Sequence, residues 1–237
     1  SVITSSLADR QSKNFVDFLT GFYARRMKRF LPALVVFVLI TSLLITLFNP
    51  DPEEALVLGG RALIGISNIT LFRSSADYFA ETSELIPFTH TWSLGVEEQF
   101  YLLFPVLIWF SGFGQQRPRG SRNLLLWVGS STLVSLLYFI HLYPINQPAA
   151  YFLMPARFWE MATGCIIFLA AQNQTKLDQA LRQVPPLPMV ATMVAAMWMP
   201  VTAAIPATIA IVVLSAVLIS CLRQGTNAYH FFTLKSV

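Results

Sequence analysis

Residues 90–101 bring together the side chains of this sequence that are best suited to chemistry: a histidine, a tryptophan, a serine, two adjacent glutamates and a tyrosine. They come directly before an apolar run at 102–110. Ionisable groups at the mouth of a membrane span are costly to desolvate, so they often mark a functional site. The alternative is an interfacial aromatic anchor followed by a solvated acidic turn. Spacing alone favours neither interpretation.

Helical spacing predicts different roles for Glu97 and Glu98. Glu97 lies four residues before Tyr101 and seven after His90, which is one stripe of a helix if the helix extends that far. A carboxylate beside an imidazole could orient it as a general base toward a substrate hydroxyl, although the same pair could simply hold the mouth of the span. We therefore expect Glu97 to face a cavity. Glu98 is expected to pair with a neighbouring helix or to lie at the level of the lipid headgroups.

A basic cluster at 22–32 contains Arg25, Arg26 and Arg29. Arg25 and Arg29 are four residues apart and therefore share a helix face. Taken alone, the cluster indicates a positive segment that sets membrane orientation and touches anionic lipid headgroups.

A third cluster contains Arg157 and Glu160, which are three residues apart and can pair within one helical turn. Pairs of this kind inside a membrane often only neutralise each other. In the stretch at 90–101, Trp92 is suited to stacking on a ring of a ligand, although tryptophans are common at membrane interfaces without any ligand.

In their order and spacing, these three clusters resemble the acyltransferase 3 family of integral membrane proteins. Members O-acylate, and usually O-acetylate, cell-surface carbohydrates. The matching motifs are Phe-Tyr-x-Arg-Arg-x-x-Arg-x-x-Pro at 22–32, His-Thr-Trp-Ser-Leu-x-x-Glu-Glu-Gln-Phe-Tyr-Leu-Leu at 90–103, and Arg-Phe-Trp-Glu at 157–160. The resemblance covers nearly the whole chain, but 172–222 matches only in hydrophobic character.

The resemblance implies an all-α, polytopic bundle of transmembrane helices in which 1–237 is part of a single acyltransferase domain of the bacterial surface-polysaccharide type. We expect this part to be truncated at both ends and inactive by itself, because the histidine credited with catalysis in the family lies in a first span that precedes the matching region. The expected location is a bacterial inner membrane, crossed several times.

The resemblance also implies roles for individual residues. The donor would be acetyl-CoA or another acyl-CoA, with no bound cofactor and no metal; guanidinium groups bind phosphates bidentately, and coenzyme A carries several phosphates. The acceptor would be a surface polysaccharide or a lipid-linked glycan, in contact with membrane lipid. The candidate catalytic residues are Glu97, Glu98 and His90, the last in a supporting role; the donor-binding candidates are Arg25, Arg26 and Arg29; and Trp92, Tyr101, Arg157 and Glu160 would serve the acceptor or support the site.

Composition supports the membrane assignment without any motif. Only 12% of the residues are charged, against roughly 25% in soluble domains. The chain is 55% hydrophobic, with a mean hydropathy of +0.59. The net charge of +4 does not indicate nucleic acid, because the basic residues cluster at the ends of the apolar runs. Two isolated cysteines, Cys165 and Cys221, indicate neither a disulfide framework nor a metal site.

Six apolar runs approach the roughly 20 residues that a bilayer span requires. A seventh run, 55–72, is interrupted by glycines, Arg61 and Asn68, and is predicted to be re-entrant or broken. The first of the six is entered by Pro32, which is tolerated near the start of a helix. The six predicted spans are 31–48, 99–113 (beginning near 94), 124–143, 158–171, 188–203 and 206–222.

Orientation follows from lysine and arginine, which accumulate on the cytoplasmic side. The basic segments are 1–30, 114–123, 172–187 and the tail after 222, and six spans place all four on one side if 55–72 does not cross. This arrangement puts Arg25–Arg29 at the inner face and His90–Glu98 at the outer face.

The competing hypothesis is a secondary transporter or a carrier of lipid-linked glycans. Broken helices such as the one predicted around Gly59-Gly60-Arg61 and intramembrane charges are features that transporters share. An internal repeat would favour it, and the sequence contains no second copy of the arginine or Trp-Ser-Leu motif.

Overall fold

The computed structural model describes residues 14–74, 87–173, 186–200 and 203–221, and within these ranges every regular element is a helix. The predicted all-α class is confirmed. Parts of three basic segments that we used for orientation, 1–13, 174–185 and 222–237, lie outside the described residues. The elements are α2 (Phe15–Phe48), α3 (Glu53–Leu63), α4 (Ser67–Arg73), the 3-10 helix η2 (Thr89–Thr91), α6 (Trp92–Phe110), α7 (Gly120–Leu142), α8 (Gln147–Phe152), α9 (Met154–Asn173), α11 (Pro186–Met197) and α12 (Ala204–Cys221).

Helix α2 is much longer than the predicted span. Its N-cap is Asn14, whose side-chain oxygen accepts a hydrogen bond of 2.8 Å from the backbone N–H of Asp17. The helix therefore begins at Phe15, sixteen residues before the predicted start of the span at residue 31. Its 34 residues extend over about 51 Å. Pro32 lies in the interior of the helix instead of its first turn, so that expectation is wrong. As a result, the basic cluster lies within a continuous helix and not before it.

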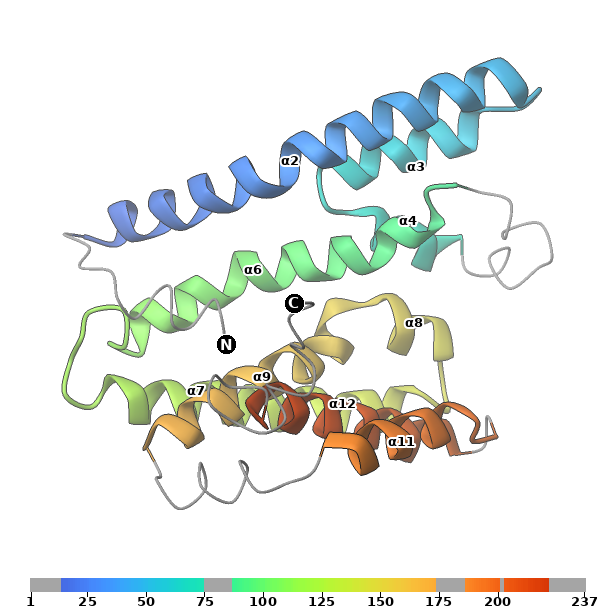
Figure 1. The fold of residues 1–237 in the computed structure, drawn as a ribbon. Helices are drawn as coiled ribbons and strands as arrows, with labels where there is room; N and C mark the ends of the chain where they lie inside the picture. The colour runs from blue at the N-terminus through green and yellow to red at the C-terminus, as the bar shows by residue number, and fades with distance from the viewer. Residues whose placement is uncertain (1–13, 75–86, 174–185, 201–202, 222–237) are drawn as a thin grey trace, which may run out of the picture.

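The interrupted segment 55–72 forms two short helices. Gly65, with a φ of +70°, makes the turn between α3 and α4 in the left-handed region that favours glycine. Helices of 11 and 7 residues extend about 16 and 10 Å, too short to cross a core of about 30 Å. Helix α3 runs back along the C-terminal half of α2 (Figure 1). Re-entry into a membrane stays a prediction.

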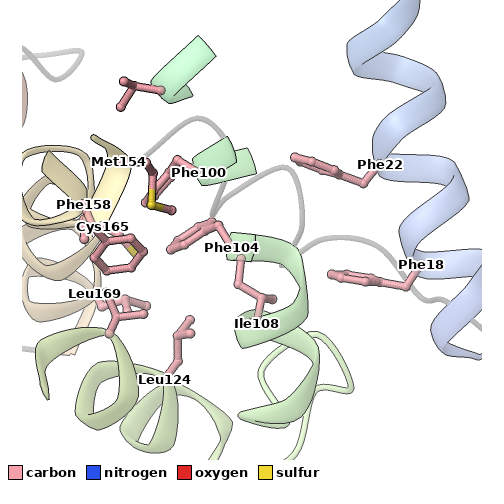
Figure 2. Packing of buried hydrophobic residues seen from close by; sticks show 13 residues of the cluster. Phe18, Phe22, Phe100, Phe104, Ile108, Leu124, Met154, Phe158, Cys165 and Leu169 are labelled. Carbon is pink, nitrogen blue, oxygen red and sulfur yellow. The ribbon is translucent and has the colours of Figure 1, made fainter. Parts of the chain in front are cut away.

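The largest buried cluster joins α2, α6, α7 and α9. Figure 2 shows Phe18 and Phe22 of α2 pointing toward α6, while the side chains of α6, α7 and α9 meet on the other side of that helix. Phe100 and Phe104 stack along α6 with ring centroids 4.9 Å apart. This cluster places α6 between α2 and α9.

Two of the helices, α2 and α7, are long and apolar enough to cross a membrane. In the most apolar 18-residue stretch of each helix, only 17% (α2) and 22% (α7) is buried within the protein, so neither is a conventional core helix. Helices α11 and α12 are also apolar but shorter, and α11 ends at Met197 instead of continuing to 203. The full set of six spans stays a prediction.

Candidate functional site

An ion pair between α2 and α6 connects two of the three motifs. Arg26 Nη2 donates to Glu98 Oε1 at 2.7 Å, and Arg26 Nε lies 3.5 Å from Glu98 Oε2. The two side chains are 20% and 26% exposed, so the pair is largely withdrawn from solvent. The centre of the Arg26 guanidinium also lies 3.3 Å from the centroid of the Tyr101 ring, within cation–π range. Arg26 is thus held by two side chains of one helix, and the predicted pairing of Glu98 with a neighbouring helix is confirmed.

This ion pair corrects the predicted separation of the two motifs. We expected Arg25–Arg29 and His90–Glu98 at opposite membrane faces, but a contact of 2.7 Å places Arg26 and Glu98 at the same depth. The physical reason is the early start of α2, which brings the arginines alongside α6 instead of leaving them at a helix end.

The three arginines of the first motif differ in exposure. Arg26 is half-buried against α6, whereas Arg25 and Arg29 are exposed. Successive residues of a helix point about 100° apart, which explains why only one of the adjacent arginines reaches α6. Two guanidinium groups therefore remain available to a ligand while the third is held by the protein.

Glu97 and His90 are both exposed, but they do not share an α-helix. Helix α6 begins at Trp92, and His90 belongs to the preceding 3-10 helix, where the Ser93 hydroxyl donates to its carbonyl at 3.3 Å. The premise that one α-helical stripe contains both residues is therefore wrong, because the helix starts two residues too late. Within the described residues, the Glu97 carboxylate makes no hydrogen bond or ion pair.

The third motif forms a second ion pair. Arg157 Nη2 donates to Glu160 Oε2 at 2.7 Å, and Arg157 Nε lies 3.1 and 3.0 Å from the two carboxylate oxygens. The predicted pairing within one helical turn is confirmed. The Arg157 guanidinium also lies 4.9 Å from the centroid of Trp92 and 5.5 Å from that of Tyr151. The third motif thus contacts the second through Trp92.

Protein side chains cover much of the Trp92 ring. Its centroid is 4.4 Å from that of Tyr151 and 5.5 Å from that of Phe152. The indole is half-buried, so a sugar ring that stacked on it would need to use the face or edge left by these neighbours and by Arg157.

A buried amide, Asn68, joins three elements and was not among the predicted site residues. Its Nδ2 donates to the carbonyl of Phe152 at 3.0 Å, and its Oδ1 accepts from Gln99 Nε2 at 2.8 Å. The same Gln99 nitrogen donates to the carbonyl of Gly65 at 3.2 Å. An asparagine inside an apolar run was the signal that could have found it, because a buried amide must find partners. These bonds hold α4 and α8 against α6.

Two glycines allow the backbone to approach this junction closely. A Cβ at Gly95 would lie 2.7 Å from Asn68 Oδ1, and a Cβ at Gly65 would lie 3.1 Å from Glu98 Cβ. The break between α3 and α4 therefore supports the residue that holds Arg26. Within the described residues, no group of three metal-ligating side chains gathers.

The site thus combines exposed guanidinium groups, an exposed carboxylate and two fixed ion pairs on one set of helices. A family model described as an acyltransferase domain matches residues 15–236, and the chain belongs to this family, acyltransferase 3, as its three motifs predicted.

Among the named relatives, the chain is similar to the O-acetyltransferase OatA of Staphylococcus aureus strain NCTC 8325, with 30% identity over 171 residues. It is also similar to the putative O-acetyltransferase SACOL0978 of Staphylococcus aureus strain COL, with 27% identity over 170 residues. In both cases the match covers 70% of this chain and 27% of the relative, so the chain spans about a quarter of these proteins. No solved structure matches the chain.

Proposed function

We propose that the chain forms part of a membrane O-acyltransferase that moves an acetyl group from acetyl-CoA, or another acyl group from its CoA ester, to a hydroxyl of a cell-surface carbohydrate. The observation that carries the proposal is the Arg26–Glu98 ion pair, through which two motifs of the family meet in space. The names of the relatives, which are O-acetyltransferases, support the acetyl group and oxygen as its destination.

A multi-pass location in a bacterial inner membrane is part of the proposal. Large apolar side chains are exposed along both α2 and α7, including Leu39 and Leu43 of the first and Leu133 and Leu137 of the second. Apolar surfaces of this extent require lipid or neighbouring helices to cover them.

The donor is proposed to bind through its phosphates to the exposed guanidinium groups of Arg25 and Arg29. Arginine suits this role because its planar fork binds phosphate bidentately. Arg26 is proposed to act as a positioning residue. The Glu98 carboxylate and the Tyr101 ring hold it against α6, and this contact fixes where Arg25 and Arg29 lie along α6.

The exposed carboxylate of Glu97 is proposed to act on the acceptor. In the transfer step, the sugar hydroxyl oxygen attacks the thioester carbonyl carbon, the carbon–sulfur bond breaks, and the hydroxyl proton leaves for a base while the thiolate of CoA is protonated. A carboxylate within reach of the hydroxyl can accept that proton. His90 would support the acceptor from the neighbouring turn, and Trp92, fixed by Arg157, would bound the same space.

The test uses the full-length protein in proteoliposomes with acetyl-CoA labelled in its acetyl group and envelope polysaccharide from the source organism. We expect label in the polysaccharide that mild alkali releases, as for an O-acetyl ester, and loss of that label with Glu97→Gln. Glu53→Gln is the matched control, because Glu53 is an exposed glutamate on α3 outside the site. Absence of alkali-labile label from the unmodified protein would contradict the proposed reaction.

A further inference from the structure

A concave site lies between α3 and α4, apart from the residues assigned to acyl transfer. It is a pocket of about 400 Å³, which is within the range of small-ligand sites. Its lining combines arginines and hydroxyls with an aliphatic wall: Glu54, Val57, Leu58, Arg61, Thr70, Leu71, Arg73 and Ser74. We refer to it as the α3–α4 pocket.

The polar side of this pocket is suited to an anion. Arg61 and Arg73 come from the last turns of two different helices, and both are exposed. Arg61 Nη1 donates to the Thr70 hydroxyl at 3.1 Å, which holds the guanidinium at the pocket while its other N–H groups stay available. Within the described residues neither arginine forms an ion pair, and Glu54 is the single carboxylate of the lining.

The apolar side indicates what carries the anion. Leu58 and Leu71 form a buried wall, and Val57, also in the lining, is 44% exposed. Among the described residues no aromatic ring lines the pocket, whereas sugar sites commonly use a stacking platform such as the Trp92–Tyr151 pair could offer. Helix α2, which packs on α3, exposes Leu44 and Leu47 toward the surroundings. An anionic group attached to an apolar body fits this combination better than a free sugar.

We propose that the α3–α4 pocket binds the phosphate group of an anionic phospholipid. The proposal goes beyond acyl transfer and shares with the proposed function only the location in a membrane. A bound lipid would join α3 to α4 through Arg61 and Arg73, across the turn at Gly65 whose backbone lies against Glu98.

The experiment measures lipid retention by the full-length protein in mild detergent with native mass spectrometry. Phosphatidylglycerol is titrated into the delipidated protein and into the double variant Arg61→Gln/Arg73→Gln. The matched control, Arg119→Gln/Arg122→Gln, removes the same charge from exposed arginines at the start of α7. We expect the pocket variant to bind phosphatidylglycerol about tenfold more weakly, as the loss of charge-assisted hydrogen bonds to one phosphate requires. The control should bind as the unmodified protein does.

Competition distinguishes the possible sources of the anion. Inorganic phosphate and a short oligogalacturonate are added to the phosphatidylglycerol complex, and neither should displace the lipid at equal concentration. Displacement by phosphate would make the pocket a site for a free anion, and displacement by the oligogalacturonate would make it a glycan site; either overturns the proposal. Equal weakening in both double variants would show a nonspecific charge effect and overturn it as well.

Single variants protect the test against misfolding. Arg61→Gln and Arg73→Gln are compared separately with the unmodified protein for elution volume and helical circular dichroism, and each should retain a folded protein with weaker lipid binding. Acetyl transfer is measured in parallel on the same preparations. If the protein transfers no acetyl group, the acyltransferase proposal fails, but the lipid-binding result still stands or falls by itself. A folded single variant of each arginine with unchanged lipid affinity would overturn the proposal.

Discussion

The two ion pairs of the site have nearly the same local geometry but join very different parts of the chain. Both have an arginine Nη2 within 2.7 Å of a carboxylate oxygen, and both place the guanidinium near an aromatic ring of α6. Arg157 and Glu160 are separated by three residues of one helix, whereas Arg26 and Glu98 are 72 residues apart on two helices. The local pair needs only α9 to form. The distant pair needs α2 and α6 to be packed at the correct height.

The difference determines what each pair can do for the protein. Loss of the local pair leaves the helix intact, and pairs of this spacing stabilise a helix only by about 0.2–0.5 kcal/mol. The two pairs are similarly withdrawn from solvent, with side chains 20% and 26% exposed in the distant pair and 24% and 17% in the local one. Only loss of the distant pair also frees α2 from the start of α6. We therefore assign the larger structural and functional weight to Arg26–Glu98.

The largest expected effect follows from breaking the distant pair. Arg26→Ala should lower acetyl transfer about 100-fold in the full-length protein, because the basic cluster loses its attachment to α6. The Michaelis constant for acetyl-CoA should rise more than that for the acceptor. Steady-state kinetics at matched expression measure both constants. Arg25→Ala removes a proposed phosphate contact but leaves α2 attached to α6, so it should raise the Michaelis constant for acetyl-CoA and slow the transfer step less than Arg26→Ala does.

A double-mutant cycle on the same pair sharpens this prediction. If Arg26 and Glu98 act through each other, the double variant Arg26→Ala/Glu98→Ala should lose no more activity than the more damaged single variant. Independent, multiplying losses would show that each residue acts alone and would remove the ion pair from the explanation.

The adjacent glutamates should separate into a chemical and a structural residue. Glu98→Gln should lower the free energy of unfolding by about 2 kcal/mol, because Arg26 loses its charged partner. Glu97→Gln should leave the unfolding midpoint unchanged and still lower the transfer rate by at least about tenfold. Thermal unfolding in detergent and transfer assays on both variants test this split; a stability loss confined to Glu97→Gln would reverse the two roles.

The close approach of α4 to α6 should be the next most sensitive feature. Gly95→Ala places a Cβ 2.7 Å from the Asn68 oxygen and should destabilise the protein by about 2 kcal/mol through overpacking. Gly129→Ala on α7 meets no atom within 4 Å and should be neutral or slightly stabilising, as expected for alanine in a helix. Unfolding midpoints of the two variants provide the comparison, and equal values would contradict the close contact between Gly95 and Asn68.

The smallest effect is expected for the local pair. Glu160→Gln should lower the free energy of unfolding by about 1 kcal/mol, less than Glu98→Gln does because no second helix is released, and reduce transfer only a few-fold, through a less ordered Arg157 beside Trp92. If Glu160→Gln lowered the free energy of unfolding as much as Glu98→Gln does, the local pair would be as important as the distant one, and the comparison between them would fail.

The predictions from sequence that proved wrong share one origin, the placement of helix ends. Hydropathy marks the apolar middle of a helix, so it predicted a first span from 31 and missed the amphipathic turns from Phe15 onward. The shared stripe of His90 and Glu97 rested on their spacing of seven residues, and spacing does not show where a helix begins; α6 begins at Trp92. The separation of Arg26 from Glu98 was a direct consequence of the first error.

The sequence by itself determined the all-helical class, the family and the Arg157–Glu160 pair, because composition, motif order and a spacing of three residues are local properties. Only the tertiary structure decided that Arg26 meets Glu98 and that Asn68 meets both Gln99 and the carbonyl of Phe152. These contacts depend on the relative height and rotation of helices that are distant in the chain. Packing sets the height and the rotation, through Phe18 and Phe22 against α6 and through the close approach of Asn68 that Gly95 permits. The periodicity of residues within one helix does not contain that information.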